Sequence, residues 1–215
     1  MIADEGDARA FCAERVDAAA LERLERLADL LSAENARQNL VSAASLDAVW
    51  QRHFADSLQL ADHVPRGTDT PTTEPGSWLD LGSGAGFPGL VLAIARPDAA
   101  FTLVESRKRR VEWLSAAAVA LGLTNCHIVG SKLENVESFA ARVITARAFA
   151  PLDKLIRLSA RFSTPATVWL LPKGRSAAQE LAEQPSAVRA MFHVEHSCTD
   201  PDGGIIVGQG TPHLP

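Results

Sequence analysis

Between residues 77 and 171 the chain alternates short apolar runs, typical of buried strands, with longer amphipathic runs, typical of helices. The predicted strands are 77–81, 100–104, 126–129, 142–145 and 166–171, and the predicted helices are 87–95, 107–121 and 152–161. Parallel strands need a crossover, usually a helix, so this alternation predicts an α/β fold of the Rossmann-like kind, with a mostly parallel, doubly wound sheet. Two further strand-like runs, 192–195 and 205–207, flank the turn sequence DPDGG and predict a C-terminal antiparallel hairpin.

The part of the chain before residue 77 follows a helical pattern instead. Apolar residues recur at spacings of three to five over 8–34, which predicts one amphipathic helix. Ser45 is a candidate N-cap for a second helix that runs to about His63. The stretch 65–76, PRGTDTPTTEPG, has the composition of a loop. We therefore expect an N-terminal helical extension (1–64), a linker (65–76) and a Rossmann-like domain (77–215).

Composition excludes several classes of protein. Apolar residues make up 47% and charged residues 22% of the chain, as in globular proteins, and no apolar run approaches the roughly 18 residues that span a bilayer. The three cysteines lie far apart, which argues against a disulfide framework and a thiolate zinc site. His193 and His196 would point to opposite faces of a strand, so we expect no metal there. The acidic start is unlike a secretory signal, and we expect a cytoplasmic monomer without a membrane segment.

The charge balance leaves a nucleic-acid partner open. Acidic residues number 26 against 21 basic ones, for a net charge of −5. Basic residues nevertheless gather at 107–110 and between 145 and 175. Such clusters are either solvated helix faces or contacts to phosphate, and bulk charge does not decide between them.

A glycine-rich segment, DLGSGAGFPG at 80–89, follows the first predicted strand and opens the first helix. Gly82, Gly84 and Gly86 stand at alternate positions, where the missing Cβ atoms permit a sharp turn and a close approach of a ligand. In a doubly wound sheet such a turn lies at the carboxyl edge, where ligands bind. The segment therefore predicts a cofactor site.

Two cofactors fit this segment. Gly84, Gly86 and Gly89 match the dinucleotide fingerprint, and Glu105, which ends the next strand, is placed to accept hydrogen bonds from a ribose of either NAD or S-adenosylmethionine. The early glycine at 82 and the negative charge of Asp80 favour S-adenosylmethionine, a cationic sulfonium. Pro88 removes an N–H that a pyrophosphate would use. An NAD-binding oxidoreductase or a regulatory nucleotide-binding module is the alternative.

Together with other motifs, this segment resembles the ribosomal RNA small subunit methyltransferase G family, also called the glucose-inhibited division protein B family. The motifs, between Asn39 and Val207, are Asn39-Leu40-Val41-Ser42, Arg52-His53-x-x-Asp56-Ser57, the glycine-rich segment, Glu105-Ser106 with Trp113-Leu114, Ser131-Lys132-Leu133-Glu134, Arg147-Ala148-Phe149 and Lys173-Gly174. The resemblance implies methylation of N7 of a guanine in 16S ribosomal RNA, with S-adenosylmethionine as cofactor and the RNA or the small ribosomal subunit particle as partner.

The resemblance also implies roles for single residues. Gly82 and Phe87 would contact the cofactor. Gly84, Gly86 and Glu105, assigned above from the turn and the strand end, would complete the cradle around it. Leu133 and Glu134 would lie beside its adenine, and Arg147 near the cofactor or the target base. The chain departs mildly from the family pattern, with Val41 for Thr, Lys132 for Arg and Ala146 for Ser.

The expected reaction needs no general base, because guanine N7 already carries an in-plane lone pair, and we therefore assign no catalytic residue. Arg52, His53 and Lys173 are candidate substrate-binding residues. Arg52 and Asp56, at i and i+4, could instead form a surface ion pair, or hold the helical extension against the glycine-rich segment. A methyltransferase with a protein or small-molecule substrate is a further alternative.

Overall fold

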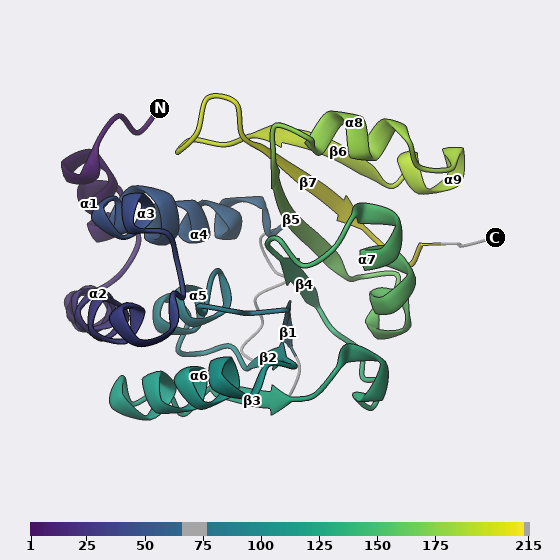
Figure 1. The fold of residues 1–215 in the computed structure, drawn as a ribbon. Helices are drawn as coiled ribbons and strands as arrows, with labels where there is room; N and C mark the ends of the chain where they lie inside the picture. Colours follow the sequence, from purple (N-terminus) through teal and green to yellow (C-terminus); the bar gives the residue numbers. More distant parts are fainter. Residues whose placement is uncertain (66–76, 213–215) are drawn as a thin grey trace.

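A seven-stranded sheet forms the centre of the computed structural model, which describes residues 1–65 and 77–212 (Figure 1). The strand order is β3-β2-β1-β4-β5-β7-β6. The strands are β1 (Trp78–Leu81), β2 (Phe101–Glu105), β3 (Cys126–Gly130), β4 (Val143–Ala146), β5 (Val168–Gly174), β6 (Phe192–His196) and β7 (Gly204–Gln209). Strands β1 to β5 pair in parallel, whereas β7 runs antiparallel to both β5 and β6. The predicted fold class and C-terminal hairpin are confirmed. Residues 66–76 of the predicted linker lie outside the described residues.

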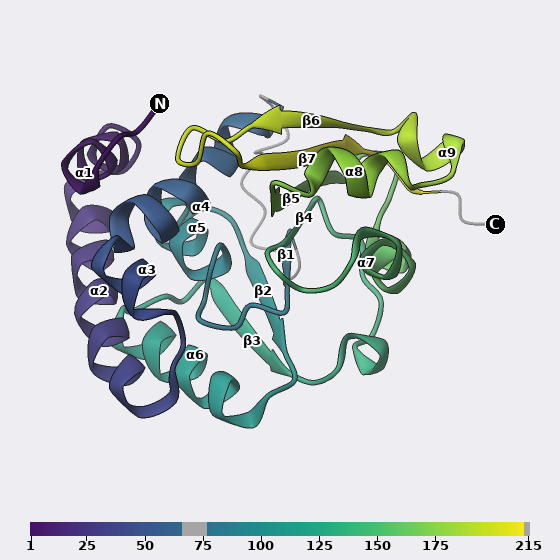
Figure 2. The same ribbon diagram turned by 45° about the horizontal axis from the view of Figure 1, so that its top comes forward.

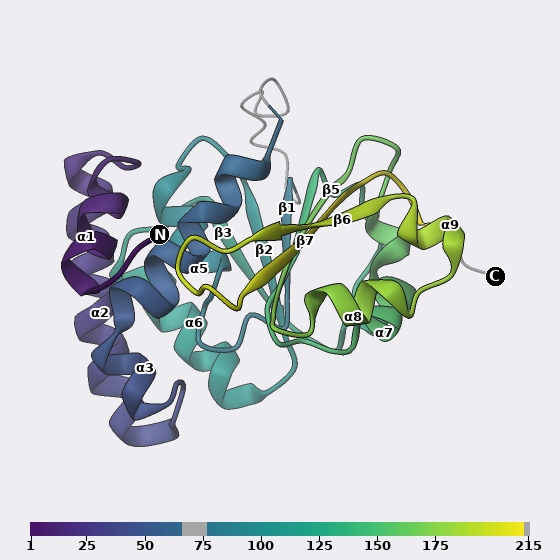
Figure 3. The ribbon, with the colours of Figure 1, turned by 90° about the horizontal axis from the view of Figure 1, so that it is seen from above.

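Helices cover both faces of the sheet, as Figures 1 and 3 show. One face carries the N-terminal helices together with α5 and α6, and the other carries α7, α8 and α9. The α-helices are α1 (Glu5–Ala13), α2 (Ala18–Gln38), α3 (Ala43–Asp47), α4 (Asp56–Leu58), α5 (Gly89–Ala95), α6 (Lys108–Ala120), α7 (Leu152–Ser159), α8 (Ala177–Ala182) and α9 (Ser186–Arg189). The π-helix is η1 (Trp50–Ala55), and the 3₁₀ helices are η2 (Gln59–His63), η3 (Leu133–Asn135) and η4 (Ala160–Phe162). Because both faces are covered, the central strands are apolar along most of their length.

The N-terminal helices differ from the prediction in two places. The single helix expected at 8–34 is two helices, because Asp17 interrupts the run and accepts a hydrogen bond from the N–H of Ala20 as the N-cap of α2. Ser42, not Ser45, caps the next helix, and it accepts a hydrogen bond from the N–H of Ser45. The helix expected to run on to His63 is built from α3, η1, α4 and η2 in succession. Helices α8 and α9 were not predicted, because their short segments carry few apolar residues.

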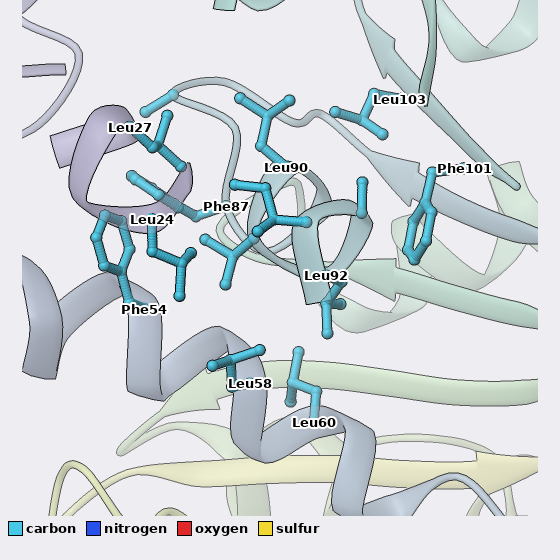
Figure 4. Close-up of a cluster of buried hydrophobic side chains, with 14 of the residues drawn as sticks. Leu24, Leu27, Phe54, Leu58, Leu60, Phe87, Leu90, Leu92, Phe101 and Leu103 are labelled. Carbon is cyan, nitrogen blue, oxygen red and sulfur yellow. The ribbon is translucent and has the colours of Figure 1, made fainter. Parts of the chain in front are cut away.

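The N-terminal helices share one hydrophobic core with the sheet (Figure 4). Leu24 and Leu27 of α2 are fully buried, as is Phe54 of η1. In the close-up they lie beside Phe87 and Leu90, at the beginning of the first crossover. A second core, centred on Trp169 and Phe162, fills the opposite face. The helical extension thus holds the start of the crossover, and with it the glycine-rich segment, in place.

This shared core predicts a large stability effect from a single truncation in α2. Leu27 is 0% exposed, so Leu27→Ala should lower the free energy of unfolding by about 2–5 kcal/mol, through lost burial and the cavity that remains. Val119, in α6, is 83% exposed, and Val119→Ala should change the free energy of unfolding by less than about 0.5 kcal/mol. Denaturant unfolding of both variants checks this. Equal effects of the two substitutions would contradict a shared core.

Candidate active site

The glycine-rich segment leaves β1 in backbone conformations that L side chains rarely adopt. Gly82, Gly84 and Gly86 have φ values of +65°, +57° and +103°. The N–H groups of Gly82 and Ser83 both donate to the carbonyl of Val104, which ends the turn against β2. A Cβ atom on Gly82 would stand 2.5 Å from the Phe149 ring. The sharp turn expected from the sequence is therefore present, and the side chain that approaches Gly82 closely is Phe149.

A cavity of about 550 Å³ opens above this segment, at the carboxyl edge of the sheet. The predicted cofactor residues that line it are Gly82, Gly84, Phe87, Glu105, Leu133, Glu134 and Arg147. Gly86 does not line it, because it faces Leu90 of α5, whose Cδ1 would lie 2.4 Å from an added Cβ. Phe149 and Arg110 also line the cavity and were missed as site residues. The Arg147-Ala148-Phe149 motif was the available signal for Phe149.

Glu105 is held by backbone N–H groups on both of its carboxylate oxygens. Oε1 accepts hydrogen bonds from Ser106 at 2.7 Å and Arg107 at 2.8 Å, and Oε2 accepts one from Gly84 at 3.1 Å. A carboxylate offers about four lone-pair sites, so Oε2 retains capacity for one more donor. The residue both ties β2 to the glycine-rich segment and can accept a ribose hydroxyl.

Asp80 supports the segment from below and does not line the cavity. Its side chain is buried, and Oδ1 accepts a hydrogen bond from the Thr145 hydroxyl at 2.7 Å. Burial raises the pKa of Asp80 to about 6, against the opposing effect of hydrogen bonds such as that from Thr145. The charge that the sequence argument placed near a cationic cofactor thus lies underneath the turn, at the interface between β1 and β4.

Arg147, which directly follows β4, joins the sheet to the N-terminal helices. Its Nη1 donates to the Arg52 carbonyl at 3.0 Å and to Asp56 Oδ2 at 2.9 Å, and its Nη2 contacts His53 Nδ1 at 2.7 Å. The guanidinium also lies 5.6 Å from the centroid of the Phe87 ring. Within the described part of the chain, its Nε–H and one Nη2–H have no partner, and both are free to bind a ligand.

A second cavity, of about 410 Å³, adjoins the first. Arg147 and Ala148 line both cavities, and the predicted substrate residues Arg52, His53 and Lys173 all line the second one. The structure therefore separates the predicted cofactor residues from the predicted substrate residues and places Arg147 between them. This arrangement provides a place for two ligands side by side.

His53 is a neutral, buried member of this site. Its ring stacks on Phe87, with centroids 4.5 Å apart and planes 4° from parallel. Burial, and then the charges of Arg147 and Arg52, lower the pKa of His53 to about 3. Arginine can only donate, so Nδ1 accepts and the proton resides on Nε2, which has no partner among the described residues.

The two other predicted substrate residues are already paired within the protein. Arg52 contacts Asp200 at 3.1 Å, with about half of its side chain exposed, and Asp56 pairs with Arg147, so the surface pair considered between Arg52 and Asp56 does not form. Lys173 is only 8% exposed, and its Nζ lies 2.9 Å from Glu180 and 2.6 Å from the carbonyl of Ala150. Burial pushes the pKa of Glu180 upward, but hydrogen bonds from Lys173 and Ser176 prevail and hold it below its usual value.

In residues 1–65 and 77–212, no group of three or more His, Cys, Asp or Glu side chains is placed to hold a metal ion. None of the helices in the same ranges is both long and apolar enough to cross a membrane. His193 lies 3.0 Å from Glu195, its neighbour along β6, and not beside His196.

Comparison with known proteins identifies the family. The profile of the family described as rRNA small subunit methyltransferase G matches residues 20–200. The ribosomal RNA small subunit methyltransferase G of Erythrobacter litoralis is 59% identical over 98% of both chains, and that of Novosphingobium aromaticivorans is 53% identical over 98% of this chain and 93% of the relative. The chain belongs to this family. The resemblance stated from the sequence motifs is confirmed.

The fold of this methyltransferase G family member also matches a solved structure. A mutant of MtNAS in complex with S-adenosylmethionine superposes with a TM-score of 0.53, at 17% identity, over 97% of this chain and 84% of that one. Family membership confirms S-adenosylmethionine, rather than NAD, as the cofactor. The site fits it, because the glycine-rich segment forms a cradle that Cβ atoms would obstruct and Glu105 keeps a free acceptor site.

A pair of glycine variants tests the cradle. Gly82→Ala adds a Cβ that meets the Phe149 ring at 2.5 Å and pushes that ring toward the cavity, so it should weaken S-adenosylhomocysteine binding more than tenfold. Gly122 has nearly the same φ, +66°, but nothing within 4 Å of its added Cβ. Gly122→Ala should therefore show the effect of backbone strain alone. In calorimetry it should bind S-adenosylhomocysteine as tightly as the wild-type chain. Equal affinities of the two variants would refute the cradle.

The depressed pKa of His53 predicts a pH effect. Below about pH 6.5 this histidine is protonated in the unfolded chain but not in the folded chain. As the pH is lowered from 6.5 toward 3, its contribution therefore reduces the free energy of unfolding by up to about 1.4 kcal/mol per pH unit. His53→Asn, which keeps an acceptor for Arg147, should remove this slope in denaturant unfolding between pH 6.5 and 4.5. By NMR, the His53 imidazole should stay neutral at pH 5. Protonation of His53 at that pH would contradict the prediction.

Proposed function

We propose that this chain methylates ribosomal RNA, at N7 of a guanine in the 16S RNA of the small subunit. The observation that carries the proposal is the pair of adjoining cavities, one above the glycine cradle and one lined by Arg52 and His53, that share Arg147. The names of the relatives support ribosomal RNA over a protein or small-molecule substrate. The N7 position rests on the motifs of the sequence and on the chemistry below.

The reaction requires positioning more than acid–base chemistry. When bound, S-adenosylmethionine supplies an electrophilic methyl group on a sulfonium. Guanine N7 carries an in-plane lone pair, so the protein's task is to place it in line with that methyl group and exclude water. Among the carboxylates that line the two cavities, Asp56 binds Arg147, Asp200 binds Arg52 and Glu105 accepts backbone hydrogen bonds. An exocyclic amine or a hydroxyl would need a base, whereas these three carboxylates are engaged in other contacts.

Arg147 and His53 would orient the base. The free Nε–H and Nη2–H of Arg147 suit the guanine O6 atom, which leaves N7 open to the methyl group. Methylation makes the guanine ring cationic, and a neutral His53 adds no further positive charge beside it. Phe87 stacks against His53 and would keep both rings beside the cofactor. The side chains thus set the geometry without taking a proton.

The substrate would be an unpaired nucleotide. In A-form RNA the major groove that displays N7 is too deep and narrow for side chains, so the target base must be splayed out or presented by the subunit particle. Arg52, half exposed, would contact phosphate. Lys173 would need to exchange its contact with Glu180 to do the same. The monomeric state and the cytoplasmic location stay predictions.

Loss and restoration of one methyl group test this function. A strain lacking the gene should lose a single N7-methylguanine from 16S RNA by mass mapping, and the wild-type chain should restore it. Arg147→Ala should lower methyl transfer at least a hundredfold, because the base loses its orienting donors. Circular dichroism and denaturant unfolding of the variant serve as the control for a folded chain. A methyl group on another atom would remove the N7 assignment, and unchanged RNA would remove the RNA assignment.

A further inference from the structure

A buried polar cluster lies behind Arg147, between the start of η2 and the connection of β6 to β7. Its members are Gln59, Ser197 and Thr199, which are 3%, 6% and 4% exposed. Gln59 Nε2 donates to Ser197 Oγ at 3.1 Å, and Gln59 Oε1 accepts from the N–H of Cys198 at 2.8 Å. Ser197 Oγ in turn accepts from the N–H of Thr199 at 3.1 Å. The cluster is therefore connected throughout, which makes it rigid.

This cluster holds the carboxylate that holds Arg147. Asp56 Oδ1 accepts hydrogen bonds from the Thr199 hydroxyl and from Gln59 Nε2, both at 2.9 Å. Its other oxygen, Oδ2, accepts the hydrogen bond from Arg147 Nη1. A carboxylate that is hydrogen-bonded on both oxygens is held in one orientation. The hydroxyl of Thr199 and the amide of Gln59 therefore fix the direction of Asp56 Oδ2, and through it the plane of the Arg147 guanidinium.

The connection of β6 to β7 brings these donors from a distant part of the chain. Thr199 is 143 residues from Asp56 in sequence, yet the connection, yellow in Figures 2 and 3, reaches back to the blue N-terminal helices. Asp200, on the same connection, binds Arg52. An apolar contact would join these elements at lower cost than buried polar groups, which must all be satisfied. Hydrogen bonds, unlike apolar contacts, are directional, so the polar contacts fit a requirement to orient Asp56.

We propose that Thr199 and Gln59 are positioning residues, which act through Asp56 to orient Arg147 toward the substrate cavity. The connection of β6 to β7 thereby becomes part of the active site: Thr199 lines the second cavity, whereas Gln59 does not. The proposal rests on the proposed function of Arg147.

Removal of one hydroxyl tests the proposal. Thr199→Val keeps the shape of the side chain and deletes the donor to Asp56, so kcat for methylation of small subunits should fall about tenfold. KM for the subunits and the Kd of S-adenosylhomocysteine should stay within about twofold, and Thr199→Ser should restore kcat. Thr167→Val is the matched control: Thr167 is equally buried and its hydroxyl donates to the carbonyl of Ala141, so kcat should not change. Where Thr199→Val does not fold, Thr199→Ala takes its place.

Two further measurements distinguish positioning from a loss of stability or of function. In an Arg147→Ala background Thr199→Val should lower kcat no further, since both act through one group. By ¹⁵N NMR, the His53 ring should lose its fixed tautomer in Thr199→Val and keep it in Thr199→Ser and Thr167→Val. The proposal would be overturned by an undiminished kcat of Thr199→Val, by losses of kcat that add in the double variant, or by an unchanged His53 tautomer in Thr199→Val. A wild-type chain that does not methylate RNA would instead defeat the proposed function and leave the NMR result to stand.

Discussion

The contact of Arg147 with η1 and α4 is the interaction on which the site depends. Arg147 directly follows β4 at the edge of the sheet. Arg52, His53 and Asp56 belong to helices that precede the sheet in sequence. The guanidinium therefore joins two parts of the chain and borders both cavities at the same time. A residue in this position can align two ligands only if the helices cannot shift relative to the sheet, and their shared hydrophobic core prevents that shift.

The glycine-rich segment shows how the same core reaches the cofactor site. Phe87 stacks on His53 and is buried with Phe54 and Leu90, so the segment is packed from behind by the N-terminal helices. Its front is bounded by Phe149, from the chain that follows β4. The cradle is thus confined between the extension and the β4 edge, and a truncated chain without residues 1–64 would expose the apolar side of Phe87.

The sequence predicted what depends on local pattern and missed what depends on distant contacts. Strand and helix periodicity placed β1 to β7 within a few residues. The positions of the strand ends predicted that Glu105 and Arg147 lie at the carboxyl edge of the sheet, where both line the first cavity. The interruption at Asp17 was missed, because the apolar spacing continues across it while a single capping hydrogen bond decides the break. The partner of Lys173 was not predictable either, since Glu180 lies on a short helix with little apolar pattern.

The three cations among the described residues that line the second cavity are each paired with a carboxylate: Arg147 with Asp56, Arg52 with Asp200 and Lys173 with Glu180. Asp56 offsets part of the charge of Arg147. His53 stays neutral because burial, and then the neighbouring guanidinium 2.7 Å away, lower its pKa. Asp80, which burial also inclines toward its neutral form, lies below the turn and not in the cavity. Under the proposed N7 methylation, the base becomes cationic beside the hydrogen-bonding fork of Arg147 and the neutral ring of His53, which favours release of the product over its retention.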